Sequence, residues 1–193
     1  HSADPDAIDI GRGLLAAWSE PHRRYHGISH LRDILDRIEE LAPYADDADS
    51  VRLAAWYHDA VYAGLPDDEE RSARRAEDEL SRLNVTAELI AEVARLVRMT
   101  ITHDPPPGDR DGEVLSDADL AALAVAGDAY RANTAAIRAE YAHVPDEAFR
   151  KGRSQVLMAL LAGPGVFRTD YARRAWESAA QDNMRAELAG LAG

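Results

Sequence analysis

Residues 50–62 read S-V-R-L-A-A-W-Y-H-D-A-V-Y, and our fold prediction is built on them. Apolar side chains would cover almost every side of a helix formed by these residues, which is typical of a helix buried in the middle of a domain. The segment contains an adjacent histidine and aspartate, His58 and Asp59. Because an unpaired charge is expensive to bury, this pair needs a partner. A hydrogen bond between the two side chains would satisfy it, and so would a divalent metal, which imidazole and carboxylate groups bind together.

Helical spacing of apolar residues continues through most of the chain, and β-branched runs are scarce. The pattern predicts further helices at 6–19, 29–41, 67–83, 86–102, 116–127, 128–142, 146–162 and 170–190. The segment D-P-P-P-G-D-R-D-G-E at 104–113 is rich in proline and glycine, and we expect a loop there. The sequence has no internal repeat, so we predict one all-α domain over residues 1–193, folded as a single compact helical bundle.

Composition narrows the classes of partner. With 193 residues, 46% of them hydrophobic, the chain is long enough to bury the core of one globular domain. Its 22 basic and 35 acidic residues leave a net charge of −13, which should repel nucleic acids and anionic membranes, so we expect neither as a partner. An anionic substrate would then need a local positive charge, which a bound metal can supply.

Cysteine is absent, which fits a reducing compartment, and we predict a cytoplasmic location. The chain begins H-S-A-D-P-D, without a methionine or an apolar signal region. We interpret His1 and Ser2 as the remnant of an expression tag and exclude them from the fold. No apolar run approaches the roughly 20 residues of a membrane span. The oligomeric state is open, with a homodimer as one alternative.

Two further regions can complete a metal site around the His–Asp pair. His30 lies on a predicted helix that can pack beside the central one. Downstream, S-D-A-D-L at 116–120 contains Asp117 and Asp119, which would point to different faces of a helix, so we expect only one of them to bind. Helix capping is the ordinary explanation of these aspartates, because Ser116 and Asp119 fit a capping box and acidic residues favour a helix N-terminus.

Taken in order, these parts resemble the H…HD…D signature of the HD superfamily of metal-dependent phosphohydrolases. The resemblance covers roughly residues 15–190. Within the superfamily, the chain is more similar to a bacterial family of stand-alone HD proteins. Gly27 and Asp68 stand where that family usually has asparagine. The segments that carry the likeness are Y-H-G-I-S-H at 25–30, A-W-Y-H-D-A-V-Y at 55–62, D-D-E-E-R-S-A at 67–73, D-A-D-L-A-A-L-A at 117–124, R-A-E-Y at 138–141 and G-R at 152–153.

The resemblance implies a division of roles among the candidate residues. Of the two histidines in Y-H-G-I-S-H, it implies that His30 binds metal and His26 protonates the leaving group, as in cyclic-nucleotide phosphodiesterases. An unligated imidazole titrates near neutral pH and can carry that proton. The alternative is that His26 is a loop residue held by Tyr25 or by solvent. The ligands implied for a divalent Mn, Fe, Co, Ni, Mg or Zn ion are His30, His58, Asp59 and Asp119, with Asp117 as the alternate.

Five other polar residues are candidates. The likeness places Glu69 and Glu70 near the site, where Glu70 can orient the attacking water and Glu69 can contact a ribose hydroxyl. Lys151 and Arg153 can bind phosphate, for which arginine offers a bidentate fork. His103 can contact phosphate or a second metal. Each also has an ordinary explanation, namely a solvated helix start for the glutamates, surface charge for Lys151 and Arg153, and a favoured helix-end position for His103.

From this resemblance we predict an enzyme, a metal-dependent phosphohydrolase that cleaves a phosphate mono- or diester by metal-activated water. The superfamily likeness implies that the substrate is a small molecule, with a nucleotide as the expected type. Two other functions fit the same pattern, a non-catalytic regulatory module that binds metal or nucleotide, and a di-iron oxygenase of the HD type. The oxygenase reading calls for more histidines than His103, which stands alone between His58 and Asp119.

Overall fold

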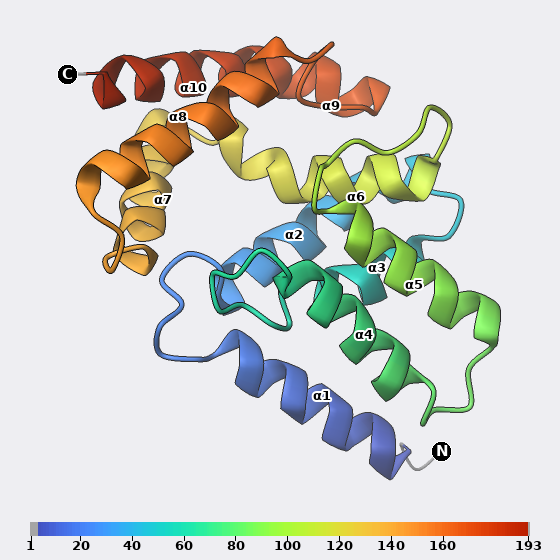
Figure 1. Cartoon of the computed structure of the whole chain (residues 1–193). Coiled ribbons are helices and arrows are strands. Elements are labelled where there is room, and N and C mark those ends of the chain that lie inside the picture. Colours follow the sequence, from blue (N-terminus) through green and yellow to red (C-terminus); the bar gives the residue numbers. More distant parts are fainter. Residues whose placement is uncertain (1–3, 193) are drawn as a thin grey trace.

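The computed structural model describes residues 4–192, which form ten α-helices and two short 3₁₀ helices, with no β-strand in that range (Figure 1). The prediction of an all-α fold is therefore confirmed. His1 and Ser2, which we predicted to be a tag remnant, lie outside the described residues. Between residues 4 and 192, none of the helices combines the length and the apolar character that crossing a membrane requires.

Helix α3 (Ala48–Tyr57) lies at the centre of the larger of two hydrophobic cores. Its Val51, Ala54 and Ala55 are completely buried, as expected for a helix that is apolar on nearly all sides. Helix α1 (Pro5–Trp18) adds Ile10 and Leu14 to this core. The helices that pack directly on α3 are α2 (Ile28–Leu41), α4 (Asp68–Leu80), α5 (Ala87–Met99) and α6 (Arg110–Leu120).

Helix α3 is shorter than the predicted 50–62, because its last residue is Tyr57 and His58 follows as the C-cap. The backbone amides beyond this point bond to side chains of α4 instead of continuing the helix. The amide of Val61 donates to Ser72 Oγ at 3.0 Å, and that of Ala63 donates to Asp68 Oδ2 at 2.7 Å. Asp68 therefore holds the loop that follows the His–Asp pair.

A second, smaller core is formed by the C-terminal part of the chain, and it includes Leu157, Phe167 and Met184. Figure 1 shows α8, α9 and α10 on one side of α6, with α4 and α5 on the other. The elements of this C-terminal part are η2 (Ala121–Ala124), α7 (Gly127–Glu140), α8 (Asp146–Ala162), α9 (Asp170–Ala175) and α10 (Glu177–Leu191). The remaining short helix, η1 (Ala42–Tyr44), follows α2 in the N-terminal half of the chain.

The predicted loop at 104–113 is wrong in its last four residues, because α6 begins at Arg110. Asp109 is the N-cap of this helix, and its Oδ1 accepts a hydrogen bond from the Gly112 amide at 3.1 Å. Gly112, which we interpreted as a helix breaker, lies in the crowded first turn, where a Cβ atom would overlap the Asp109 carboxylate. A side chain at this position would displace the carboxylate that caps α6, so glycine suits this helical position.

Two other predictions are corrected by the positions of helix ends. The capping box of Ser116 and Asp119 is wrong, because both residues lie inside α6 and not at its start. The predicted helix 170–190 is divided at Trp176 into α9 and α10. At this break the Glu177 carboxylate accepts hydrogen bonds from the amides of the 166–167 segment, which competes with a continuous helix.

We expect Asp109→Ala to lower the free energy of unfolding by about 1–2 kcal/mol, because α6 loses its N-cap. The variant also loses the ion pair with Arg95, whose Nη1 lies 2.6 Å from Asp109 Oδ2. Urea denaturation followed by circular dichroism measures the change. Asp109→Asn is the control, since asparagine caps as well as aspartate, and it should retain most of the stability. An equal loss in both variants would show that the cap contributes little.

Candidate metal centre

Three side chains from three helices meet at one end of a cavity. His30 lies in the first turn of α2, His58 ends α3, and Asp119 lies near the end of α6. One donor atom of each residue lies within 4.8 Å of the other two. His30 Nε2 is 3.1 Å from Asp119 Oδ1, and His58 Nε2 is 3.9 Å from the same oxygen. The structure therefore brings together three of the four metal ligands that the sequence predicts.

The surroundings of His58 suit a metal ligand. Its Nδ1 lies 2.8 Å from the Ala55 carbonyl oxygen, which can only accept, so Nδ1 carries the proton and donates. Nε2 then presents its lone pair, and this buried atom has no hydrogen-bond partner among the described residues. The Trp18 ring, with its centroid 5.3 Å from that of His58, holds the imidazole from one side. A buried polar atom without a partner is costly, and a metal ion would satisfy it.

Asp119 supplies the negative charge of this cluster. Burial by itself would raise the pKa of Asp119, but the positive charge that His58 carries when it is protonated and the hydrogen bond from His30 outweigh burial and hold the pKa below its ordinary value. Two imidazole nitrogens and a carboxylate fit Mn, Fe, Co, Ni or Zn. The orphaned Nε2 of His58 and the convergence of three donors show that these residues fit a divalent metal ion.

Asp59 lies beside the cluster. Its Oδ2 is 3.5 Å from His58 Nε2, yet the side chain is not one of the three whose donor atoms all lie within 4.8 Å of one another. The carboxylate lines the cavity. Asp59 can therefore reach a bound metal, or hold an attacking water, from the open side of the cluster.

Asp117, the alternate ligand, points elsewhere. Its carboxylate accepts hydrogen bonds from the backbone amides of Arg168 at 2.7 Å and Thr169 at 2.8 Å, so it joins α6 to the segment before α9. Burial raises the pKa of Asp117 to about 6. As expected for residues two apart on a helix, the two aspartates serve different faces. Asp119, and not Asp117, belongs to the cluster.

His103 approaches the second oxygen of Asp119, with its Nε2 3.4 Å from Oδ2. Its backbone has a φ of 51°, which is uncommon for a residue other than glycine. Burial lowers the pKa of His103, partly offset by the charge of Asp119, and its Nδ1 is buried without a partner among the described residues. His103 is therefore a largely buried part of the cavity wall rather than a solvated helix end.

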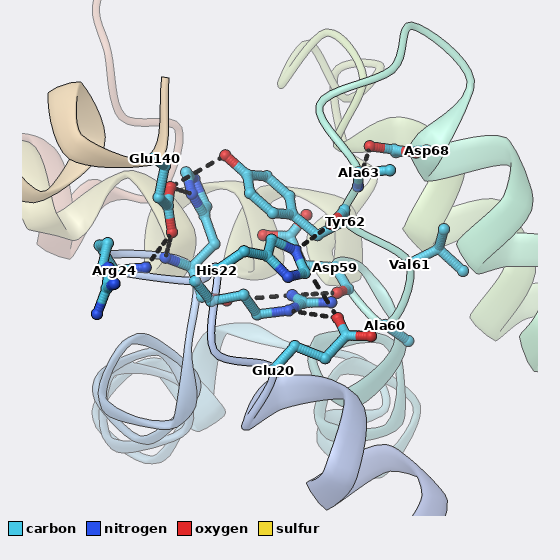
Figure 2. Close-up of polar contacts among 12 residues, drawn as sticks. Glu20, His22, Arg24, Asp59, Ala60, Val61, Tyr62, Ala63, Asp68 and Glu140 are labelled. Atoms are coloured by element: carbon cyan, nitrogen blue, oxygen red, sulfur yellow. Dashed lines mark hydrogen bonds and ion pairs between the residues drawn. The ribbon is translucent and has the colours of Figure 1, made fainter. Parts of the chain in front are cut away.

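His26, the predicted acid, is held by a residue to which we assigned no role. Its Nδ1 lies 2.7 Å from Glu140 Oε2, and the other carboxylate oxygen accepts the backbone amides of Arg24, Tyr25 and His26 at 2.7–2.9 Å. Figure 2 shows the Tyr62 ring beside the Glu140 carboxylate, to which its hydroxyl donates at 3.1 Å. An Nδ1–H donated to Glu140 leaves Nε2 as the free ring nitrogen of His26.

The Glu140 carboxylate is suited to this positioning role. Burial alone would raise the pKa of Glu140, but the hydrogen bond and charge of His26 and the backbone amides lower it to about 2. The carboxylate stays ionised at neutral pH and remains able to accept the hydrogen bond from the His26 ring. The sequence signal was the R-A-E-Y segment at 138–141, which belongs to the family likeness but gives no hint of its partner.

Arg23 connects the loop that contains His26 to the His–Asp pair. Its side chain is 1% exposed, and its Nη1 donates to the backbone carbonyls of His26 at 3.1 Å and Asp59 at 2.8 Å. The guanidinium lies 5.5 Å from the centroid of the Trp18 ring and 5.3 Å from that of Tyr62. Sequence reasoning missed Arg23, because nothing local separates it from the other arginines.

The structure separates the two predicted glutamates. Glu69 lines the cavity, and burial raises the pKa of Glu69. Glu70, which we predicted to be catalytic, lies outside the lining and is held in ion pairs with Arg98 at 2.7 Å and Arg74 at 2.8 Å. Consecutive residues of a helix point about 100° apart, so only one of the two faces the cavity. Glu70 therefore lies outside the cavity in which we predicted it to act.

The two predicted phosphate-binding residues are also separated. Lys151 is exposed and is not part of the cavity lining. Arg153 does line the cavity, but its Nε and Nη2 lie 2.8 Å and 3.1 Å from the two carboxylate oxygens of Glu187. The bidentate fork that we expected to bind phosphate is thus engaged within the protein.

A scan against protein-family models and searches of curated proteins and of solved structures gave no match to this chain. The function is therefore argued from the residues of the site and from their geometry.

We expect Asp119→Ala to weaken the binding of Co²⁺ or Mn²⁺ by at least about 100-fold, since outer-shell changes alone cost 10–100-fold. Calorimetric titration of the metal-free protein measures the affinity, and the visible spectrum of the Co²⁺ form reports on the ligands. Asp117→Asn, on the same helix two residues away, is the matched control and should bind metal as the parent does. Equal affinities for both variants would contradict the ligand set.

The low pKa of Glu140 leads to a prediction of how the free energy of unfolding depends on pH. Because the folded pKa lies below the ordinary 4.5, the charged group contributes stability above pH 4.5 that is lost as the pH falls toward 2. We expect Glu140→Gln to be less stable than the parent at pH 7 by on the order of 2–3 kcal/mol, with the difference shrinking through that window. Urea denaturation at pH 3–7 with a chelator present measures it. A difference that does not change with pH would contradict the assignment.

Proposed function

We propose that this chain is a metal-dependent phosphohydrolase that cleaves a phosphate mono- or diester, with a nucleotide as the expected substrate. The observation that supports it most directly is the convergence of His30, His58 and Asp119 beside a histidine held by a buried carboxylate. This combination offers a metal ligand set and a separate proton donor in one cavity. A cytoplasmic location remains a prediction from the sequence, and the oligomeric state stays open, with a homodimer as one alternative.

The chemistry divides between the metal and the side chains. A divalent metal bound at the cluster would lower the pKa of a water molecule and neutralise charge on a phosphoryl oxygen. Asp59 and Glu69, which both line the cavity, are placed to orient that water by accepting its hydrogen bonds. In the hydrolysis, a water oxygen would form a bond to phosphorus and give its proton to one of these carboxylates, while the bond from phosphorus to the alcohol oxygen breaks.

His26 supplies the proton that the departing alcohol requires. Its ring centroid lies 5.5 Å from that of His30, so a substrate that touches the cluster also comes within reach of His26. Glu140 holds Nδ1 and stabilises the protonated ring, and the proton on Nε2 is then available for the leaving oxygen. Arg23 holds the backbone of His26 and Asp59 at a constant separation.

A hydrolysis panel tests the proposal. Phosphate or alcohol release would be measured over nucleotides, cyclic nucleotides, simple alkyl phosphates and p-nitrophenyl phosphate, with Mn, Co, Ni, Mg, Zn and Fe(II) in turn. We expect release that depends on metal and is abolished in Asp59→Ala. Metal binding without any turnover would instead support the regulatory module, and oxygen consumption by the iron form would support the oxygenase.

The role of His26 has its own signature. We expect His26→Gln to lower kcat by about 10²–10⁴-fold for alkyl phosphates, whose leaving alcohols need a proton. For p-nitrophenyl phosphate, whose leaving group departs as a stable anion, the loss should be much smaller. Metal affinity, measured by calorimetry, should not change. Equal losses for both classes of ester would contradict the role of His26 as the acid.

A further inference from the structure

The cavity extends well beyond the metal cluster. Its volume is about 870 Å³, near the upper end for small-molecule sites. The cluster occupies one end, together with Asp59, Glu69 and His26. The remaining walls come from the end of α6, from η2, and from α7 and α8, and they are mainly apolar. The side chains that carry this apolar wall are Leu120, Leu123, Ile137, Phe149, Val156 and Leu160.

The apolar part offers little to a second anionic group. Among the described residues that line the cavity, Arg153 is the single lysine or arginine, and Glu187 already holds its Nε and Nη2. Tyr130, which also lines this part, donates its hydroxyl to the same carboxylate. A phosphoryl group therefore gains its charge compensation at the metal end of the cavity and not against α7 and α8.

Two large apolar side chains of the cavity lining are exposed to solvent. Ile101 and Val156 both line the cavity, and they are 55% and 52% exposed. They come from different elements, the turn after α5 and helix α8. An apolar portion of a ligand that reached these two side chains would remove part of their surface from water.

We propose that the natural substrate is a phosphate ester whose alcohol portion is largely apolar, aliphatic or aromatic, and lies against the α7–α8 wall while its phosphoryl group meets the cluster. This inference rests on the proposed phosphohydrolase activity, and it replaces the nucleotide that the family resemblance implies with an ester of an apolar alcohol. The uncharged side chains of this wall that can bond a hydroxyl group are few, Asn133, Thr134 and Gln155 among them, so a polyhydroxylated alcohol would bury most of its hydroxyl groups against apolar surface. An apolar portion instead gains by leaving water.

Binding of alkylphosphonates tests this without turnover, because their phosphorus–carbon bond is not hydrolysed by this chemistry. Calorimetry on the Mn²⁺-loaded chain would compare methyl-, propyl- and hexylphosphonate. We expect Kd to fall by about fourfold for each added methylene group, as burial of a methylene predicts. Hydrolysis of hexyl phosphate should likewise exceed that of glycerol phosphate in kcat/KM by at least tenfold, although both release a primary alcohol.

Val156→Asn is the test variant and Met158→Asn its matched control. The two residues lie on the same helix and are 52% and 53% exposed, but only Val156 lines the cavity. We expect the ratio of the methyl to the hexyl Kd to fall by about threefold in Val156→Asn and to stay unchanged in Met158→Asn.

Different results separate this inference from the proposed function. Phosphonates that all bind with the same Kd, with phosphate esters still hydrolysed, would overturn the apolar alcohol and leave the phosphohydrolase standing. If no phosphonate bound the metal-loaded chain and no ester were cleaved, the proposed function itself would fail.

Discussion

The structure depends on how one buried imidazole is satisfied at the end of α3. The packing of α3 on all sides buries His58, and the Ala55 carbonyl accounts for one of its two ring nitrogens. A buried nitrogen without a partner costs about 1–3 kcal/mol, so the other needs a partner from outside α3. Helices α2 and α6 both pack on α3, which is why His30 and Asp119 arrive at the same point. The helix packing that forms the core therefore also brings together the side chains of the candidate metal centre.

Contacts between distant parts of the chain hold His26 next to the cluster of His30, His58 and Asp119. Glu140 ends α7 and binds three consecutive amides of the loop before α2, so the wall of the apolar cavity also holds His26. Arg23 links the same loop to the carbonyl of Asp59. A shift of Glu140 or Arg23 would alter the distance between His26 and the candidate metal ligands, and under the proposed function small shifts of this kind would be costly for catalysis.

Local patterns in the sequence predicted what depends on local physics. Periodicity gave the helices and the burial of α3, and it matched α8 at both ends. It failed where a side chain from elsewhere determines the helix end, as with Asp68 on the loop after His58. Partners of Glu140, Glu70 and Arg23 lie tens of residues away in sequence, so spacing could not assign them. The grouping of His30, His58 and Asp119 was foreseen through the family resemblance, not through periodicity.

Charge explains why the cluster and the apolar wall belong to one site. The chain carries −13, and many arginines are engaged in ion pairs on the surface, as Arg52, Arg95 and Arg98 are. Within the described residues, no arginine pairs with Asp59 or Asp119, so this end of the cavity is anionic until a cation enters. Under the proposed function, a bound metal ion would supply the positive charge that a phosphate ester needs at this end of the cavity. Because that compensation is confined to one end, the rest of the cavity can select a ligand by burial of apolar surface.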